Sequence, residues 1–224
     1  MIAASVLVAG CSHGVGGEAQ KSQPSLSARP STTRSATPTT SPPPSAPKQA
    51  PGPGAPIADV IAWIQAGSPA DPGAYRVATR SGETTQLGDD VAFITPSTKA
   101  NCMTDSKFSG GDLACLLKLT NPPPPPADVY GQWKGNWVDY DGKSIRIGSV
   151  HGDPGRFSAG SGPELPYGQA LAFGDYRCRS DPAGLFCVNY AHQSAARFSD
   201  SGVEPFGCLK PMAPYPQIGE MFGC

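Results

Sequence analysis

The stretch CRSDPAGLFC, residues 178–187, carries two cysteines on either side of a predicted tight turn. Its central DPAG has Asp at position i, Pro at i+1 and Gly at i+3, the residue types that a type I turn favours. Pairing Asp181 with Gly184 across the turn places Cys178 opposite Cys187, at the closer, non-hydrogen-bonded kind of pair if the 181/184 pair is hydrogen-bonded. Cα atoms so placed lie about 4.5–5.5 Å apart, which a disulfide can bridge. The stretch therefore predicts a β-hairpin closed by a disulfide.

The other cysteines predict two further disulfides. All but one of the seven cysteines lie after residue 100, and an even number in an exported domain predicts a disulfide framework. A polar, glycine-ended loop of hairpin type separates Cys102 from Cys115, so these two can face each other. That leaves Cys208 to pair with Cys224. No zinc site is predicted, because no Cys-x-x-Cys pair is present and disulfides belong to oxidising compartments.

Short segments suited to β-strands recur on both sides of this hairpin, bounded by Gly, Pro, Asn or Asp. We expect strands over residues 75–80, 91–95, 113–120, 129–140, 143–150, 170–179, 185–191 and 195–198. Asp141-Gly142 is a hairpin signal between two of them. Short strands at regular spacing predict a mainly β fold, a disulfide-stapled antiparallel β-sandwich or barrel.

One N-terminal helix is predicted before the first strand. Its apolar residues recur at i, i+3, i+4 and i+7 and form one stripe: Ile57, Val60, Ile61 and Ile64. Pro56 suits the start of the helix, and Gly67 with Pro69 suits its end. We expect the stripe to pack on the domain, with an interaction helix as the alternative.

The N-terminus predicts export and lipidation. The apolar run MIAASVLVAGC ends in VAGC at residues 8–11, the pattern of a bacterial lipobox, in which Cys11 receives a diacylglyceryl group. No Lys or Arg precedes Cys11, and the apolar run is at the short limit for a secretory signal. Either the true start lies upstream of Met1, or the segment is not a signal. We expect a signal peptide over residues 1–10.

Residues 11–55 are predicted to be the lipidated cysteine followed by a disordered tether. Most of this segment is Ser, Thr, Pro, Ala and Gly, which cannot bury enough apolar area to offset the entropy of ordering. Threonines beside prolines resemble an O-glycosylated stalk, and an unmodified spacer is the alternative. The folded all-β domain is then residues 56–224, long enough to bury a sizeable core.

Net charge and hydropathy limit the kinds of partner that the protein is expected to have. The net charge of −1 indicates no nucleic-acid footprint, so no nucleic-acid partner is expected. No other apolar run approaches the roughly 18 residues that span a bilayer. The expected partners are the membrane, through the two acyl chains of a diacylglyceryl anchor, and a cell-wall glycan, lipid or envelope protein. No cofactor and no metal are expected.

Several short motifs of the domain resemble those of a known family. They lie at residues 93–97, 101–102, 113–115, 130–131, 137, 152–153, 165–168, 173, 176–178 and 186–189. This series, over residues 90–208, is similar to a family of small actinobacterial secreted proteins and lipoproteins, and most similar to mycobacterial Lpp-type cell-envelope lipoproteins. The sequence departs from the family pattern at Ala100-Asn101 and at residues 191–194. The resemblance implies location and fold, and it implies no chemistry, because the family has no established activity.

Two tryptophans are candidates for ligand contact. Trp133 and Trp137 share parity on one predicted strand and would lie on the same face of it. There they could form an aromatic platform for glycans or lipids. Packing in the core is the favoured alternative for such large indoles.

Two histidines of the domain are the other candidates. His151 and His192, with Asp153, Asp175 or Glu164, could form a metal site or an acid–base pair. The spacing is common by chance, and loop histidines are usually solvated. Ser161 lies in AGSGP and not in Gly-x-Ser-x-Gly, so a hydrolase nucleophile elbow is not supported.

The expected function follows from these features. We expect a lipid-anchored protein on the extracytoplasmic face of the cell membrane, whose domain is a binding or structural module and not an enzyme. The alternative is a small extracytoplasmic enzyme, a hydrolase or a metal-dependent one, that uses His151 or His192.

Overall fold

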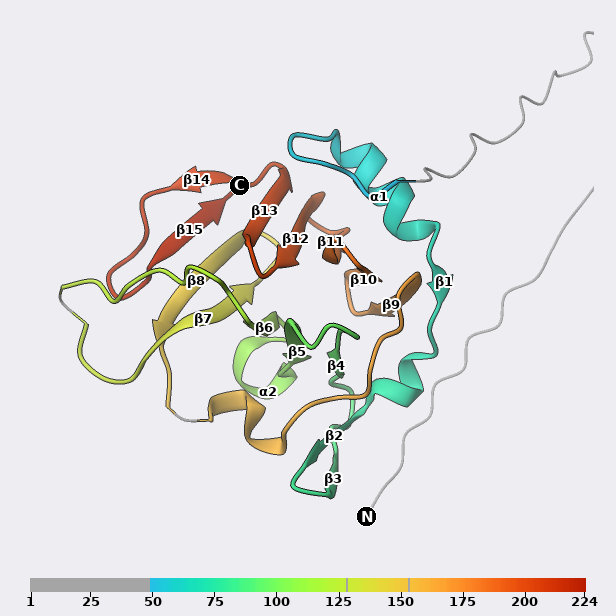
Figure 1. Ribbon diagram of the computed structural model, residues 1–224, viewed down its shortest axis with the longest axis horizontal. Helices are drawn as coiled ribbons and strands as arrows, with labels where there is room; N and C mark the ends of the chain where they lie inside the picture. The colour runs from blue at the N-terminus through green and yellow to red at the C-terminus, as the bar shows by residue number, and fades with distance from the viewer. Residues whose placement is uncertain (1–48, 128, 153) are drawn as a thin grey trace, which may run out of the picture. The chain divides into compact units, whose positions relative to one another are not determined.

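The computed structural model describes residues 49–127, 129–152 and 154–224 (Figure 1). The predicted signal peptide, Cys11 and most of the predicted tether lie outside the described residues. Within the described ranges, no helix has both the length and the apolar character needed to cross a bilayer. These residues form a mainly β structure with one helix of more than two turns, which confirms the predicted fold class.

The elements are, in chain order, α1 (Ile57–Gln65), β1 (Ser68–Pro69), η1 (Pro72–Tyr75), β2 (Val77–Arg80), β3 (Glu83–Gln86), β4 (Ala92–Ile94), β5 (Ala100–Thr104), α2 (Ser106–Ser109), β6 (Leu113–Leu117), β7 (Trp133–Tyr140), β8 (Ser144–Val150), η2 (Gly155–Ala159), β9 (Gln169–Phe173), β10 (Tyr176–Asp181), β11 (Gly184–Asn189), β12 (Ser194–Ser199), β13 (Gly202–Gly207), β14 (Lys210–Met212) and β15 (Glu220–Gly223). Sheet I has the strand order β1-β9-β10-β11-β12-β13, and sheet II has the order β14-β15-β8-β7-β6-β5-β4. Strands β2 and β3 form a separate hairpin.

The β10–β11 hairpin has the register that its turn chemistry predicts. Asp181 pairs with Gly184, and Cys178 pairs with Cys187. The backbone N–H of Ala183 donates to Asp181 Oδ1 at 2.9 Å, an Asx turn that supports the tight connection. The Cys178–Cys187 disulfide joins Cα atoms 4.0 Å apart, which fits the closer kind of antiparallel pair.

The other two predicted disulfides are also present. Cys102 pairs with Cys115 across β5 and β6, with Cα atoms 4.1 Å apart. The intervening loop contains the short helix α2, which Asp105 caps. Cys208, which follows β13, bonds to Cys224, which follows β15, with Cα atoms 4.8 Å apart. Each cysteine of the domain therefore pairs with its neighbour in sequence.

Sheets I and II pack face to face, so the fold is a β-sandwich and not a closed barrel. Alternate residues of each strand point into the shared core. Its buried side chains include Val138, Tyr140, Ile145 and Ile147 from sheet II, and Leu171, Leu185, Ala196 and Phe198 from sheet I. The Cys102–Cys115 and Cys178–Cys187 disulfides lie in this same core, one in each sheet.

Helix α1 covers the outer face of sheet I (Figure 1). The buried residues of this layer are Val60, Trp63 and Ile64 from the helix, with Phe186, Val188, Ala195 and Phe206 from the sheet. Burial of a Val, Ile or Phe side chain in this layer contributes about 1.5–3 kcal/mol to stability. The predicted stripe thus packs on the domain. Ala50 and Ala55 pack against the same layer, so packing begins before the boundary predicted at residue 56.

The outer face of sheet II is covered by the β2–β3 hairpin and by the segment that contains η2. Its buried residues are Ala92, Met103, Ala114 and Trp137 from the sheet, with Ala78 from β2 and Phe157 from η2. Segment 155–165 also bonds to strand edges, since Leu165 N–H donates to Ile94 O at 2.8 Å. This cover leaves Trp137 of β7 and His151, the residue after β8, beside a pocket.

The single strand predicted over residues 170–179 is wrong. The chain reverses at Gly174-Asp175, so that β9 and β10 form an antiparallel hairpin with Phe173 paired to Tyr176. Gly174 has φ 48°, a left-handed backbone that glycine adopts without a Cβ penalty. Its neighbours have strand character on both sides, which is why the alternation alone did not reveal the turn.

The C-terminal tail contains strands where the sequence indicated none. β15 pairs with β8 through Glu220–Gly223 opposite Ser144–Ile147, and β14 pairs with β15 at the edge of sheet II. Pro211 lies in β14, and Pro205 lies in β13 at the edge of sheet I. Proline has no N–H to donate to a ladder, so it is tolerated in such edge strands. Their proline content is therefore the reason that neither edge strand, β13 or β14, was predicted from the sequence.

Candidate functional site

The imidazole of His151 lies flat against the indole of Trp137 on the outer face of sheet II. Alternate residues of β7 point into the core, which directs Trp137 and Asp139 to the opposite face. The ring centroids of His151 and Trp137 are 3.7 Å apart, and their planes differ by 19°. Phe157 packs edge-on against the indole at 5.1 Å. The structure thus brings together two of the four predicted contact residues.

The Asp139 carboxylate links three side chains of this cluster. Trp137 Nε1 donates to Asp139 Oδ1 at 3.0 Å. Arg156 Nη2 lies 3.5 Å from the same oxygen, and His151 Nε2 lies 3.8 Å from Asp139 Oδ2. Asp139 is only 8% exposed. A carboxylate so buried requires such partners, because an unpaired buried charge costs several kcal/mol.

A hydrogen bond with Ser149 fixes the Nε2 edge of the His151 imidazole. Ser149 Oγ lies 2.6 Å from His151 Nε2, and either atom can be the donor. An irregularity in the ladder places it there, since the pairing of β7 with β8 shifts register between Lys134 and Val138. Gly148 has φ 73° at this point, and a Cβ there would lie 2.6 Å from the Trp133 ring. The bulge therefore determines the position of Ser149 relative to His151.

A pocket of about 330 Å³ opens beside this cluster. It is lined by Asp105, Phe108, Trp137, His151, Gly155, Arg156 and Ser158. The Phe108 side chain stands at the rim and is 81% exposed. Asp105 Oδ1 accepts the backbone N–H of Phe108 at 3.0 Å, which caps α2 and holds Phe108 in place. We call this the Trp137–His151 pocket.

Arg156 supplies the positive charge of the pocket. Its Nη1 donates to the carbonyl oxygen of Asp112 at 3.1 Å, and its contact with Asp139 is longer. The guanidinium carries five N–H donors in a planar fork. Among the described residues, Arg156 makes one short bond to a neutral carbonyl and one long contact to a carboxylate, which leaves donors that a bound ligand can use.

Burial controls the protonation of two groups near the pocket. It lowers the pKa of His151; Asp139 opposes this shift, and Arg156, Arg146 and Lys134 add to it. The shift favours the neutral form of the imidazole. Burial also raises the pKa of the Asp112 carboxyl, helped by Asp141 and Asp139 and opposed by Arg146 and Arg156.

Trp133 lies apart from Trp137. Its Nε1 donates to the carbonyl oxygen of Pro123 at 3.0 Å, and its ring lies beside Gly148. No ring contact joins the two indoles within the described ranges. Because the β7–β8 ladder is irregular between them, their shared parity does not bring them together.

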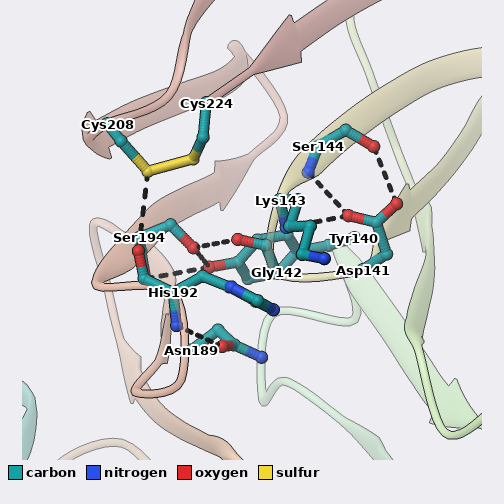
Figure 2. The surroundings of a disulfide bond; sticks show 10 residues. All are labelled: Tyr140, Asp141, Gly142, Lys143, Ser144, Asn189, His192, Ser194, Cys208 and Cys224. Carbon is teal, nitrogen blue, oxygen red and sulfur yellow. Dashed lines mark hydrogen bonds between the residues drawn. A yellow bond between two sulfur atoms is a disulfide. The ribbon is translucent and has the colours of Figure 1, made fainter.

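His192 lies in the loop between β11 and β12, beside the Cys208–Cys224 disulfide (Figure 2). Its backbone N–H donates to Asn189 Oδ1 at 3.1 Å. It lines a groove of about 600 Å³ with residues 54–57, Gln193, 205–208 and Lys210. The two candidate histidines therefore belong to different surfaces.

Ser161 has a structural partner. Asn101 Nδ2 donates to Ser161 Oγ at 2.8 Å, so Ser161 ties the cover segment to β5. In the part of the chain that the structure describes, no group of three or more His, Cys, Asp or Glu side chains is arranged to hold a metal ion. Asp153 lies outside the described residues.

No family model, curated protein or solved structure matches the chain.

The sequence analysis singled out neither Phe108 and Arg156, which line the pocket, nor Asp139 and Ser149, which bond to the Trp137 and His151 rings beside it. The sequence did contain a signal for Asp139. It lies two residues after Trp137 on the same predicted strand, so the two side chains lie on the same face. Phe108 and Arg156 lie in the β5–β6 and β8–β9 connections and give no periodic signal. Only the packing of those connections on sheet II brings them to the pocket.

Proposed function

We propose that this chain is a lipid-anchored cell-envelope protein whose β-sandwich binds a ligand in the Trp137–His151 pocket. The anchor would be a diacylglyceryl group on Cys11, and the domain would lie on the extracytoplasmic face of the membrane. The lipobox pattern at residues 8–11 supports the anchor. Three disulfides support an oxidising location, because such bonds persist mainly outside the cytoplasm.

The observation that carries the binding function is the composition of the pocket. It combines an exposed aromatic ring, Phe108, with the convergent polar groups of Arg156, His151 and Ser158. Binding sites typically combine apolar or aromatic lining with a few fixed polar groups that set orientation. A sugar ring has an apolar face for Phe108 and hydroxyl or carboxylate substituents for Arg156. A cell-wall glycan is therefore the ligand class that we propose.

The geometry around His151 favours binding over hydrolysis. In a serine hydrolase triad, the serine contacts one imidazole nitrogen and the carboxylate orients the ring through the other. Here Ser149 Oγ and Asp139 Oδ2 both approach Nε2, at 2.6 and 3.8 Å. Ser149 is also only 7% exposed, so its Oγ is poorly placed to attack a substrate. These contacts support a role in positioning the imidazole.

Titration of the full chain with soluble peptidoglycan fragments tests this function. Saturable changes in the NMR signals of Phe108, His151 and Arg156 are expected. Phe108→Ala should raise Kd about tenfold, a loss of about 1.4 kcal/mol, without changing stability, because the side chain is exposed. Tyr215→Ala is the matched control, since Tyr215 is 59% exposed and lines a different groove.

Three results would contradict the proposal. The first is the absence of any saturable change with the glycan fragments. The second is an equal loss of affinity in Phe108→Ala and Tyr215→Ala. The third is binding of phospholipid vesicles, and not of glycan fragments, through Phe108, which would assign the pocket to a lipid.

A further inference from the structure

The three disulfides differ sharply in solvent access. Cys102, Cys178 and Cys187 are 0% exposed, and Cys115 is 1% exposed. Cys208 and Cys224 both belong to the exposed class of residues. A thiolate must reach a sulfur atom to break a disulfide, so access separates the third bond from the other two.

The exposed disulfide links a residue just after sheet I to a residue just after β15 of sheet II (Figure 2). Cys208 follows β13, the edge strand of sheet I, and Cys224 follows β15, which is paired to β8 in sheet II. Cys208 lines the groove of about 600 Å³ that His192 also lines. This groove gives an attacking thiol room to approach Cys208 Sγ. That sulfur lies 3.6 Å from the carbonyl oxygen of His192, and it has no hydrogen to donate while it is bonded to Cys224.

We propose that the Cys208–Cys224 bond is a thiol–disulfide exchange site, reduced by a dithiol while the sandwich stays folded. One thiolate of the dithiol attacks Cys208 Sγ, forms a mixed disulfide with it and expels Cys224 as a thiolate. The second thiol of the dithiol, as its thiolate, then attacks its own partner sulfur in the mixed disulfide and releases Cys208 as a thiolate. Two electrons pass to the protein, the dithiol becomes a cyclic disulfide, and its two protons go to Cys208 and Cys224.

Other contacts hold this edge of the sandwich when the bond is open. Tyr140 Oη lies 2.7 Å from Ser194 Oγ, and Ser194 Oγ donates to the carbonyl oxygen of Gly142 (Figure 2). This buried bridge ties β7 of sheet II to β12 of sheet I. Leu209 is 1% exposed and Met221 is 5% exposed, so both ends of the tail remain anchored by apolar packing.

Backbone pairing holds the tail as well. Four residues of β15 pair with β8, and Cys224 N–H donates to Lys143 O at 2.9 Å. Opening the disulfide therefore removes one covalent link and leaves the ladder and the core contacts. The expected change is local loosening of β14, β15 and the groove rim, without loss of the two core disulfides.

Timed reduction of the full native chain with dithiothreitol, followed by alkylation and peptide mapping, tests the proposal. Label should enter Cys208 and Cys224 at least about a hundredfold faster than the four core cysteines, because the core bonds react only after the structure opens. Near-ultraviolet circular dichroism should stay native after the fast phase. Amide exchange should rise in residues 220–223 and not in β10 or β11.

Two variants make the outcome decisive. Cys208→Ala/Cys224→Ala should abolish the fast phase and keep the native spectrum. Cys178→Ala/Cys187→Ala should keep the fast phase at Cys208 and Cys224. The proposal is wrong if all three bonds reduce at one rate, if the exposed bond reacts only in denaturant, or if its reduction alone unfolds the domain.

Discussion

His151 and Trp137 form a stacked pair, with ring centroids 3.7 Å apart, in which the imidazole covers an indole that is only 2% exposed. One carboxylate, that of Asp139, bonds to the indole Nε1 and faces the imidazole Nε2. The ligand-facing surface of this part of the pocket is therefore the imidazole and not the tryptophan. The indole supports the imidazole from behind. The protonation state of His151 therefore determines whether a ligand meets a neutral or a charged ring.

Stability should fall as pH drops below the pKa of an unfolded histidine, in part because of His151. Its folded pKa is lowered, chiefly by burial, so the unfolded chain binds the proton more readily in this pH range. The neutral imidazole therefore contributes stability above about pH 6.5, and this contribution is lost as pH falls toward the folded pKa. Urea midpoints of the wild type and of His151→Gln, measured at pH 7.5 and 5, should differ in their pH dependence.

His192→Gln is the matched control for this measurement. It removes a histidine at a different surface and leaves His151 with its partners, so the part of the pH dependence that comes from His151 should be retained. An unchanged pH dependence in His151→Gln, or the same change in both variants, would contradict the prediction.

The two tryptophans should differ in their contribution to stability. Trp137 is buried in the outer layer of sheet II, whereas Trp133 is half-buried against Pro123. Trp137→Ala should cost about 3–5 kcal/mol, as truncation of a large buried ring does, and Trp133→Ala should cost less. Trp137→Phe should cost about 1–3 kcal/mol, because the buried Asp139 carboxylate loses a donor. Urea denaturation measures all three, and equal losses for the two alanine variants would contradict this ranking.

Local chemistry explains which parts of the fold could be predicted. The β10–β11 register follows from a turn whose Asp, Pro and Gly each have a fixed position, and a disulfide then confirms the pairing. Helix α1 follows from one apolar stripe. Both elements are specified by residues within about ten positions of each other, so no knowledge of distant partners was needed.

The elements that could not be predicted depend on distant partners. β15 is a strand because it pairs with β8, and nothing in its own sequence outweighs the prolines before it. The pocket is assembled from α2, β7, η2 and the residue after β8, so Phe108 and Arg156 meet His151 only in the folded chain. The alternation placed Trp133 and Trp137 together, and the bulge between them overrode it.

Membrane association should depend on Cys11. If the lipobox at residues 8–11 is processed, Cys11 carries two acyl chains, which hold a protein stably at a bilayer. Cys11→Ala expressed in a bacterium that processes lipoproteins should move the protein from the membrane fraction to the soluble fraction. Cys208→Ala/Cys224→Ala is the control, since it removes cysteines that play no part in anchoring. Unchanged partitioning of Cys11→Ala would rule out the anchor.

The core disulfides should contribute more to the stability of the sandwich than the terminal one does. Closing a loop of the size between Cys178 and Cys187 stabilises by about 2.5–3 kcal/mol on the chain-entropy model, and a similar value applies to each of the three loops. Removing Cys178 and Cys187 also leaves unfilled volume in a core that holds Leu185 and Phe198, which adds a cavity cost. The exposed Cys208–Cys224 pair leaves no such cavity, and its loop is a tail that β8 already holds. Calorimetry of Cys178→Ala/Cys187→Ala should therefore show a larger fall in Tm than that of Cys208→Ala/Cys224→Ala. An equal or larger fall for the terminal pair would mean that this link, and not the sheet pairing, holds the edge of the sandwich.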